Sequence, residues 1–170
     1  MKIGHITLKN NLILAPMAGV TDSPFRRLVA GEGCGLVVSE MVSAKGLVMG
    51  GERTRNLLDM FDEERPIAVQ IFGAEPESMA EAALIVEEMG ADMVDINMGC
   101  PVKKVVSQGA GSALLKNLSL MEEILKKVRA GIKVPLTIKI RSGWDDSSKV
   151  ALHVLKLAEG NGVDAIALHP

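Results

Sequence analysis

Short apolar runs and longer amphipathic segments alternate along the whole chain, and this alternation limits the folds that the sequence can adopt. The apolar runs predicted as buried strands are Leu12–Ala15, Leu36–Ser39, Ile67–Phe72, Met93–Asn97, Leu136–Arg141 and Ala165–His169. The segments predicted as helices are Pro24–Ala30, Pro76–Met89, Leu118–Ala130 and Ser147–Glu159. In the last three, apolar residues recur at spacings of three and four. Strands and helices that alternate at a repeat of roughly 30 residues form a parallel sheet with right-handed crossovers.

The predicted helix ends carry residues that favour starting or stopping a helix. Candidate starts are Pro76, then Asn117 or Ser119, then Asp146 or Ser147. Proline suits the first helical turn, and an Asn, Ser or Asp side chain can accept a hydrogen bond from a backbone N–H there. Candidate stops are Gly90, Gly131 and Gly160, because a residue in the left-handed conformation often terminates a helix.

Two folds fit this order of elements, a doubly wound open sheet and an eight-fold barrel. Strands covered by helices on both faces are apolar throughout. Here polar residues alternate near the carboxyl ends of several strands: Gln70, Asp95 with Asn97, and Lys139 with Arg141. Alternation by two places each set on one side of its strand, while Ile138 and Ile140 face the other side. A polar inner side and an apolar outer side under helices favour the α/β fold of a TIM (β/α)8 barrel.

The chain has 170 residues, whereas such a barrel typically needs about 250. We therefore expect residues 1–170 to be the N-terminal portion of a barrel catalytic domain, truncated after about six β/α units. The alternative is a natural short form that is completed by self-association or by a partner chain, because an open sheet exposes strand edges.

Composition indicates a folded protein and excludes few functions. Hydrophobic residues make up 48% and charged residues 24% of the chain, and the net charge is -2. There is no global basic excess to neutralise phosphates, although a local basic groove remains compatible with this charge. Two cysteines are too few for a disulfide framework. Since the sequence also lacks a signal peptide and any long apolar stretch, it predicts a cytoplasmic protein without a membrane segment.

Lys139 is a candidate ligand-binding residue, because a cation inside a barrel is costly unless an anion or a dipole offsets its charge. One interpretation is an internal ion pair, for instance with Asp95. The other is a fixed positive charge that faces an electron-rich ligand. The residues alone leave both interpretations open.

Cys100 lies in the segment Asn97–Pro101, after the fourth predicted strand and at the end of the barrel that holds catalytic residues in this fold. It could act as a nucleophile with His169 as its base, as a proton donor, as a metal ligand or as a small buried residue. A metal site is disfavoured, because no second Cys or His lies at ligand spacing. Cys34 precedes a strand at the opposite end, where packing is the expected role.

Two glycine-containing segments are weaker candidates. After the first strand, Pro16 prevents further pairing, and the small residues Ala18 and Gly19 let a ligand approach the backbone closely. The alternative there is an ordinary turn in which Thr21, Asp22 or Ser23 caps the next helix. Gly109–Ser112 could present backbone N–H groups to an anion, but it lacks the lysine and the spacing of a known phosphate-binding loop. Lys103 and Lys104 are predicted to be solvated charges.

Taken together, these segments resemble the tRNA-dihydrouridine synthase family, and within it the bacterial B-type branch. The matching segments are LAPMAGVTDSPFR at 14–26, VSEM at 38–41, VQIFG at 69–73, DINMGCPVKKV at 95–105, GAGSALL at 109–115, KIRSGWD at 139–145 and LHP at 168–170. DINMGCP combined with KIRSGW is the most specific part. The resemblance implies an FMN-dependent enzyme that uses NADPH to reduce uridine in tRNA to 5,6-dihydrouridine. It also implies a TIM barrel followed by a small helical tRNA-binding domain, which residues 1–170 do not include.

The resemblance further implies roles for individual residues. Around the flavin, Pro16, Met17 and Ala18 would pack against the ring system. Gln70 would form a hydrogen bond with the pyrimidine edge of the flavin, and Lys139 would lie near N1 and the C2 carbonyl. His169 would contact the flavin or its phosphate side. Asn97 and Arg141 would hold the uracil after it is flipped out of the RNA. Hydride would pass from flavin N5 to C6 of the uracil, and Cys100 would donate a proton to C5. A thiol suits this role, because its ordinary pKa of about 8.5 keeps it protonated at neutral pH.

Two other functions remain open at this point. The first is a flavin-dependent oxidoreductase that acts on free pyrimidines, similar to the dihydroorotate and dihydropyrimidine dehydrogenases, which share the barrel and a lysine near the flavin. Arg141 beside Lys139 and the NMGCP loop favour the RNA enzyme. The second is a non-catalytic barrel fragment that binds RNA or a partner chain.

Overall fold

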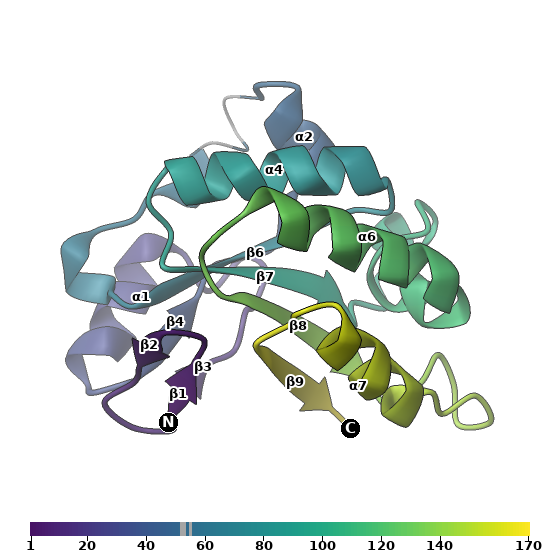
Figure 1. Cartoon of the computed structure of the whole chain (residues 1–170). Helices are drawn as coiled ribbons and strands as arrows, with labels where there is room; N and C mark the ends of the chain where they lie inside the picture. Colours follow the sequence, from purple (N-terminus) through teal and green to yellow (C-terminus); the bar gives the residue numbers. More distant parts are fainter. Residues whose placement is uncertain (52–53, 55) are drawn as a thin grey trace.

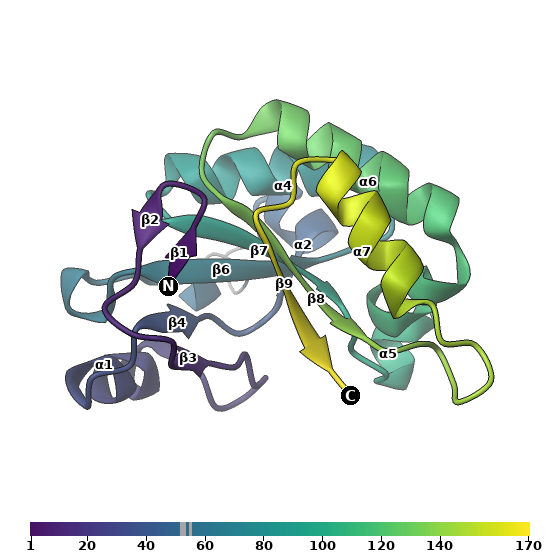
Figure 2. The same cartoon turned by 60° about the horizontal axis from the view of Figure 1, so that its bottom comes forward.

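The main sheet of the protein is parallel and curved. The computed structural model describes residues 1–51, 54 and 56–170. The sheet order is β3-β4-β6-β7-β8-β9, and β5 pairs with β6 off this path. The strands are β3 (Ile13–Leu14), β4 (Leu36–Val38), β5 (Val42–Ser43), β6 (Ile67–Phe72), β7 (Met93–Met98), β8 (Leu136–Arg141) and β9 (Ala165–His169). The strands fan around a common inner side as half of a barrel, with helices along the outer side (Figure 1, Figure 2). The fold is therefore α/β and of the truncated TIM-barrel type.

Helices cover the outer side of this half-barrel. The helices there are α1 (Ser23–Gly31), α2 (Ala44–Val48), α4 (Pro76–Glu88), α6 (Leu118–Gly131) and α7 (Ala151–Gly160). The short helix α5 (Lys103–Val106) and the 3-10 turns η1 (Asn56–Leu58), η2 (Asp62–Glu64) and η3 (Gly111–Lys116) lie in the connections between the longer elements. No helix in the described part of the chain is long and apolar enough to cross a membrane.

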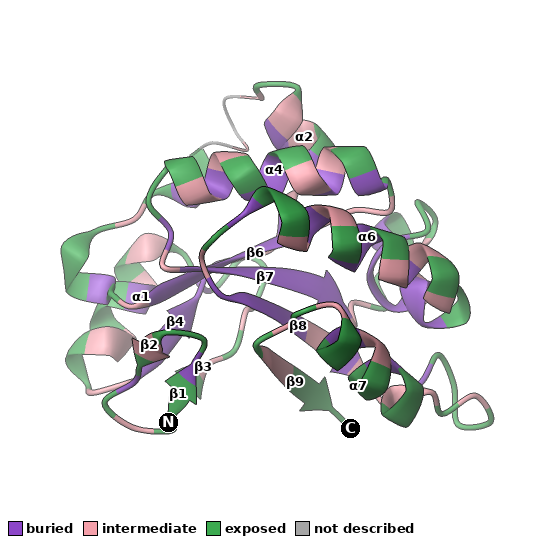
Figure 3. Cartoon of the chain, viewed as in Figure 1, coloured by how far each residue is buried: buried purple, intermediate pink, exposed green. Residues whose placement is uncertain are grey.

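The two faces of the sheet are packed differently. On the outer face, Ile96, Ile138 and Ile140 join a large core with α4 and α6, as the alternation in the sequence predicts. On the inner face, the amino-terminal half is apolar and is covered by the hairpin of β1 (Lys2–Ile3) and β2 (Ile6–Thr7). Colouring by burial shows β6, β7 and β8 as the buried centre of the sheet (Figure 3). The polar residues of the inner face are thus left near the carboxyl ends of the strands.

Most predicted elements are confirmed, with small shifts at their ends. Pro76 is the first residue of α4, and the Asn117 side chain accepts a hydrogen bond from the Leu120 N–H at 3.1 Å to cap α6. Gly90 adopts a left-handed φ of 91° after α4. The hairpin β1–β2, strand β5 and helices α2 and α5 are not among the predicted elements, because each is only two to five residues long.

The fourth predicted helix is present as α7, but its predicted start is wrong, as is the left-handed conformation expected at two of the predicted stops. Helix α7 begins at Ala151 rather than Ser147, and neither Asp146 nor Ser147 caps it. The chain first folds back on itself, with the N–H groups of Val150 and Ala151 donating to the carbonyl of Ser142. Gly131 and Gly160 are the last residues of α6 and α7, but neither has a left-handed φ. After α7, the left-handed residue is Gly162, with a φ of 70°.

Candidate functional site

The register of the central strands gathers polar side chains at one end of the half-barrel. The pairs in register are Gln70 with Asp95, Asn97 with Lys139, and Arg141 with His169. Residues in register on neighbouring parallel strands point to the same face of a sheet. The polar residues that alternate in the sequence therefore meet on the inner face, near the carboxyl ends of the strands.

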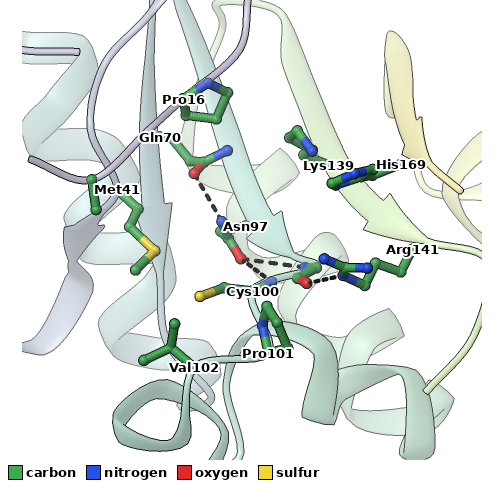
Figure 4. Close-up of a pocket in the computed structure, with 12 residues that line it drawn as sticks. Pro16, Met41, Gln70, Asn97, Cys100, Pro101, Val102, Lys139, Arg141 and His169 are labelled. Atoms are coloured by element: carbon green, nitrogen blue, oxygen red, sulfur yellow. Dashed lines mark hydrogen bonds between the residues drawn. The ribbon is translucent and has the colours of Figure 1, made fainter. Parts of the chain in front are cut away.

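A pocket of about 260 Å³ lies at this end. It is lined by most of the site residues that the sequence predicts: Pro16, Ala18, Gln70, Asn97, Cys100, Lys139, Arg141 and His169. Lys139 and His169 lie on one side of Asn97, and the Cys100 sulfur points toward Met41 on the other side (Figure 4). A cation, amide groups and a thiol therefore face one cavity.

Met17 is the one predicted site residue that does not line this pocket. Its backbone N–H donates to Thr21 Oγ1 at 3.0 Å, and its carbonyl accepts from the N–H groups of Val20 and Thr21. Thr21 is fully buried and closes this turn, while Asp22 caps α1 by accepting from the Phe25 N–H at 3.0 Å. The backbone of Met17 thus holds together the turn that carries Pro16 and Ala18.

The Cys100 loop is fixed by hydrogen bonds on several sides. Asn97 Oδ1 accepts from the Cys100 N–H at 2.9 Å and from the Gly99 N–H at 3.3 Å. Arg141 Nε donates to the Gly99 carbonyl at 3.0 Å, and the Ser112 N–H donates to the Cys100 carbonyl at 3.0 Å. Two of these bonds appear as dashed lines from Asn97 in Figure 4. The loop is therefore preorganised by its neighbours.

The segment Gly109–Ser112 supports this loop. The segment is buried at Ala110, Gly111 and Ser112. The Ser112 N–H donates its hydrogen bond to the Cys100 carbonyl. The prediction that these N–H groups are presented to an anion is therefore wrong for Ser112. Lys103 and Lys104 are exposed, as predicted.

Lys139 is half-buried, and among the described residues it has no acidic partner within 4.0 Å. The internal ion pair with Asp95 that the sequence leaves open is therefore not formed. Burial lowers the pKa of Lys139. The negative charge of Asp95 raises this pKa, and the positive charge of Arg141 lowers it further. Burial raises the pKa of Asp95, while hydrogen bonds from Gln70 and Thr137 lower it. The pocket thus holds a desolvated cation without a direct counter-ion.

Comparison with known proteins identifies the family. A family model described as dihydrouridine synthase matches residues 13–170. The chain belongs to the dihydrouridine synthase family. The tRNA-dihydrouridine synthases B of Pseudomonas aeruginosa and Vibrio parahaemolyticus are each 49% identical to it over 169 residues, which is 99% of this chain and 51% and 52% of those proteins. A probable tRNA-dihydrouridine synthase of Rickettsia conorii is 46% identical over 170 residues, covering 99% of this chain and 51% of that protein. The chain spans about half the length of the curated relatives it matches.

These comparisons confirm the family and the B-type branch that the motifs indicate. The pocket also includes Met41, which is not among the predicted site residues. Met41 ends the VSEM motif, which carries part of the resemblance, but no polar atom or alternation pattern singles it out. Gly99, Pro101 and Val102 line the pocket as well, as parts of the loop around Cys100.

The residues that line the pocket offer groups that could hold a flavin. A flavin ring is flat and carries carbonyl groups, and its reduced form holds negative charge. Lys139 offers a desolvated cation, and Gln70 and Asn97 offer amide N–H donors on the same wall. Pro16 and Ala18 also line the pocket and offer small apolar contacts. Within the described ranges, no three His, Cys, Asp or Glu side chains lie close enough together to hold a metal ion.

Cys34, by contrast, lies away from the pocket. It is half-buried, and its sulfur lies 3.4 Å from the Leu12 carbonyl and 3.2 Å from the Leu36 carbonyl. These strand-edge contacts agree with the packing role expected from the sequence.

Proposed function

We propose that the protein carrying this chain reduces uridine in tRNA to 5,6-dihydrouridine, with FMN as its cofactor and NADPH as the reductant. The observation that supports this function is the pocket itself, in which a desolvated cation, two amides and a thiol meet. The names of the curated relatives support the same reaction. The proposed substrate places the protein in the bacterial cytoplasm, where tRNA is found.

Residues of the first and central strands would hold the cofactor. Pro16 and Ala18 would pack against the ring, Gln70 would donate to a ring carbonyl, and His169 would bind at the rim of the pocket. Lys139 would stabilise negative charge on the ring, because a preorganised cation in a water-poor site acts strongly on nearby charge. When bound, the flavin would supply the hydride that adds to C6 of the uracil, at the expense of NADPH.

Cys100 would complete the reduction by giving its thiol proton to C5. The double bond between C5 and C6 then becomes a single bond, and solvent returns a proton to the thiolate. Arg141 and Asn97 hold the backbone of the Cys100 loop. They would also hold the uracil, which must leave the folded RNA to reach a pocket of this kind.

The decisive variant is Cys100→Ala in the protein as its gene encodes it. Removal of a general acid lowers the rate by about 100-fold or more. We expect dihydrouridine in tRNA, measured by mass spectrometry after incubation with NADPH, to fall accordingly. Flavin absorbance of the purified variant should stay as in the wild type. The matched control is Cys34→Ala, which removes the other thiol of the chain and should leave the rate unchanged.

Other outcomes would favour other functions. Wild-type activity in Cys100→Ala would refute the proton-donor role. Turnover of free uracil or orotate without reduction of tRNA would favour an oxidoreductase of free pyrimidines. A wild-type protein that purifies without flavin, and in which Cys100→Ala changes nothing, would favour a non-catalytic fragment that binds RNA or another chain.

A further inference from the structure

Asp95 is a buried carboxylate in β7 that is joined to the Cys100 loop by two side-chain amides. It is 5% exposed and is not among the residues that line the pocket. Its Oδ2 accepts from Gln70 Nε2 at 2.6 Å, and its Oδ1 accepts from the Thr137 hydroxyl. Gln70 Oε1 then accepts from Asn97 Nδ2 at 2.9 Å, a bond drawn in Figure 4. Asn97 Oδ1 ends this chain of bonds on the Cys100 N–H.

The two ends of this chain determine the direction of every bond in it. An ionised carboxylate can only accept hydrogen bonds, and a backbone N–H can only donate. Gln70 must therefore turn its nitrogen toward Asp95 and its oxygen toward Asn97. Asn97 must in turn meet that oxygen with its nitrogen, which leaves its own oxygen for the Cys100 loop. If either amide were reversed, two donors or two acceptors would face each other in a buried place.

The direction of these hydrogen bonds also determines which amide groups remain free to bind a ligand in the pocket. Gln70 and Asn97 each use one amide N–H within the chain of bonds. The other N–H of each amide has no protein partner among the described residues. The wall of the pocket formed by β6 and β7 therefore presents donors, which suits the carbonyl oxygens of a flat heterocycle.

We infer that Asp95 is a positioning residue: its acceptor-only carboxylate orients both amides, and thereby holds the Cys100 loop and turns N–H donors into the pocket. Its influence on the reaction rests on the proposed function. Its influence on the loop does not, because that follows from the hydrogen bonds of this chain alone.

The Cys100 backbone N–H reports directly on the far end of this arrangement. We propose to measure its hydrogen exchange by NMR in the protein as its gene encodes it. Asp95→Ala removes the acceptor that orients Gln70, and the Cys100 N–H should then exchange about tenfold faster, as expected for the loss of one hydrogen bond. The Ser112 N–H, which donates to the Cys100 carbonyl outside this chain, should keep its protection.

A matched control and an exchange of charge sharpen the test. Asp92→Asn changes another acidic residue of the same segment, which accepts from the Ile67 N–H, and should leave the Cys100 N–H unchanged. Gln70→Glu alone places two carboxylates in contact and should also speed the exchange at Cys100. Adding Asp95→Asn restores a donor opposite that carboxylate, which still accepts from Asn97. Exchange at Cys100 should then return to within about twofold of the wild type.

Two results would overturn the inference. One is unchanged exchange at Cys100 in Asp95→Ala. The other is a double variant that exchanges as fast as Gln70→Glu alone, and this comparison decides the matter even where Asp95→Ala does not fold. Flavin binding is a separate readout, and it should stay weak in the double variant, because position 70 then lacks an N–H donor. Failure of the wild type to bind flavin would count against the proposed function and leave the exchange pattern as the test of Asp95.

Discussion

The Arg26 guanidinium and the Glu64 carboxylate form an ion pair inside the protein, with 2.5 Å between Nε and Oε2 and side-chain exposures of 2% and 0%. Arg26 also donates to the carbonyl oxygens of Thr21 and Asp59, at 2.8 Å and 2.6 Å. Thr21 closes the turn that carries Pro16 at the edge of the pocket. The pair therefore ties that turn to η2, a segment about forty residues later in the sequence.

We expect Glu64→Gln to lower the free energy of unfolding by about 3–5 kcal/mol, because it leaves the buried Arg26 charge without its partner. Urea denaturation followed by circular dichroism measures this loss. The matched control is the neighbouring pair of Arg27 and Glu63, which is 3.4 Å apart and has exposures of 45% and 63%. There, Glu63→Gln should change the free energy by less than about 1 kcal/mol. Equal midpoints for the two variants would show that the Arg26 charge is satisfied without Glu64.

Gly111→Ala should displace the Cys100 loop. Gly111 has a left-handed φ of 61°, and an added Cβ would lie 2.5 Å from the Cys100 carbonyl oxygen. We expect a loss of about 2 kcal/mol or more in unfolding free energy, together with faster alkylation of Cys100 by iodoacetamide. Gly31→Ala is the control, because a Cβ there meets nothing within 4 Å and φ lies outside the left-handed range. An alkylation rate in Gly111→Ala equal to that of the control would contradict this account of the loop.

The central strands and the composition of the pocket could be predicted because they depend on short-range rules. Alternation by two places Asp95 and Asn97 on one face of β7, and Lys139 and Arg141 on one face of β8, whatever the rest of the chain does. Parallel strands joined by helices bring their carboxyl ends together at one edge. The family motifs then indicate which chemistry these residues support.

The features that the sequence did not predict depend on contacts between distant residues. The connection between Asp95 and Cys100 requires that Gln70 lie in register with Asp95, and register is a property of the assembled sheet. The start of α7 is set by the carbonyl of Ser142, which accepts from two later N–H groups, and not by a local capping residue. The hydrogen bond from the Ser112 N–H to the Cys100 carbonyl likewise depends on the position that the Cys100 loop takes in the folded chain.

Lys139→Met should stabilise the fold while weakening flavin binding. Burial lowers the pKa of Lys139 below its ordinary value of 10.5, and the attraction of Asp95 is already included in that balance. The charged lysine therefore opposes folding at neutral pH, and this penalty disappears as the pH rises from the lowered pKa to 10.5. We expect the melting temperature of Lys139→Met to exceed that of the wild type most at neutral pH, and the gain to vanish above that window. The control Lys133→Met removes the same charge from an exposed position. A gain in Lys139→Met that does not change with pH, or that Lys133→Met shares, would show that burial of the charge is not its cause.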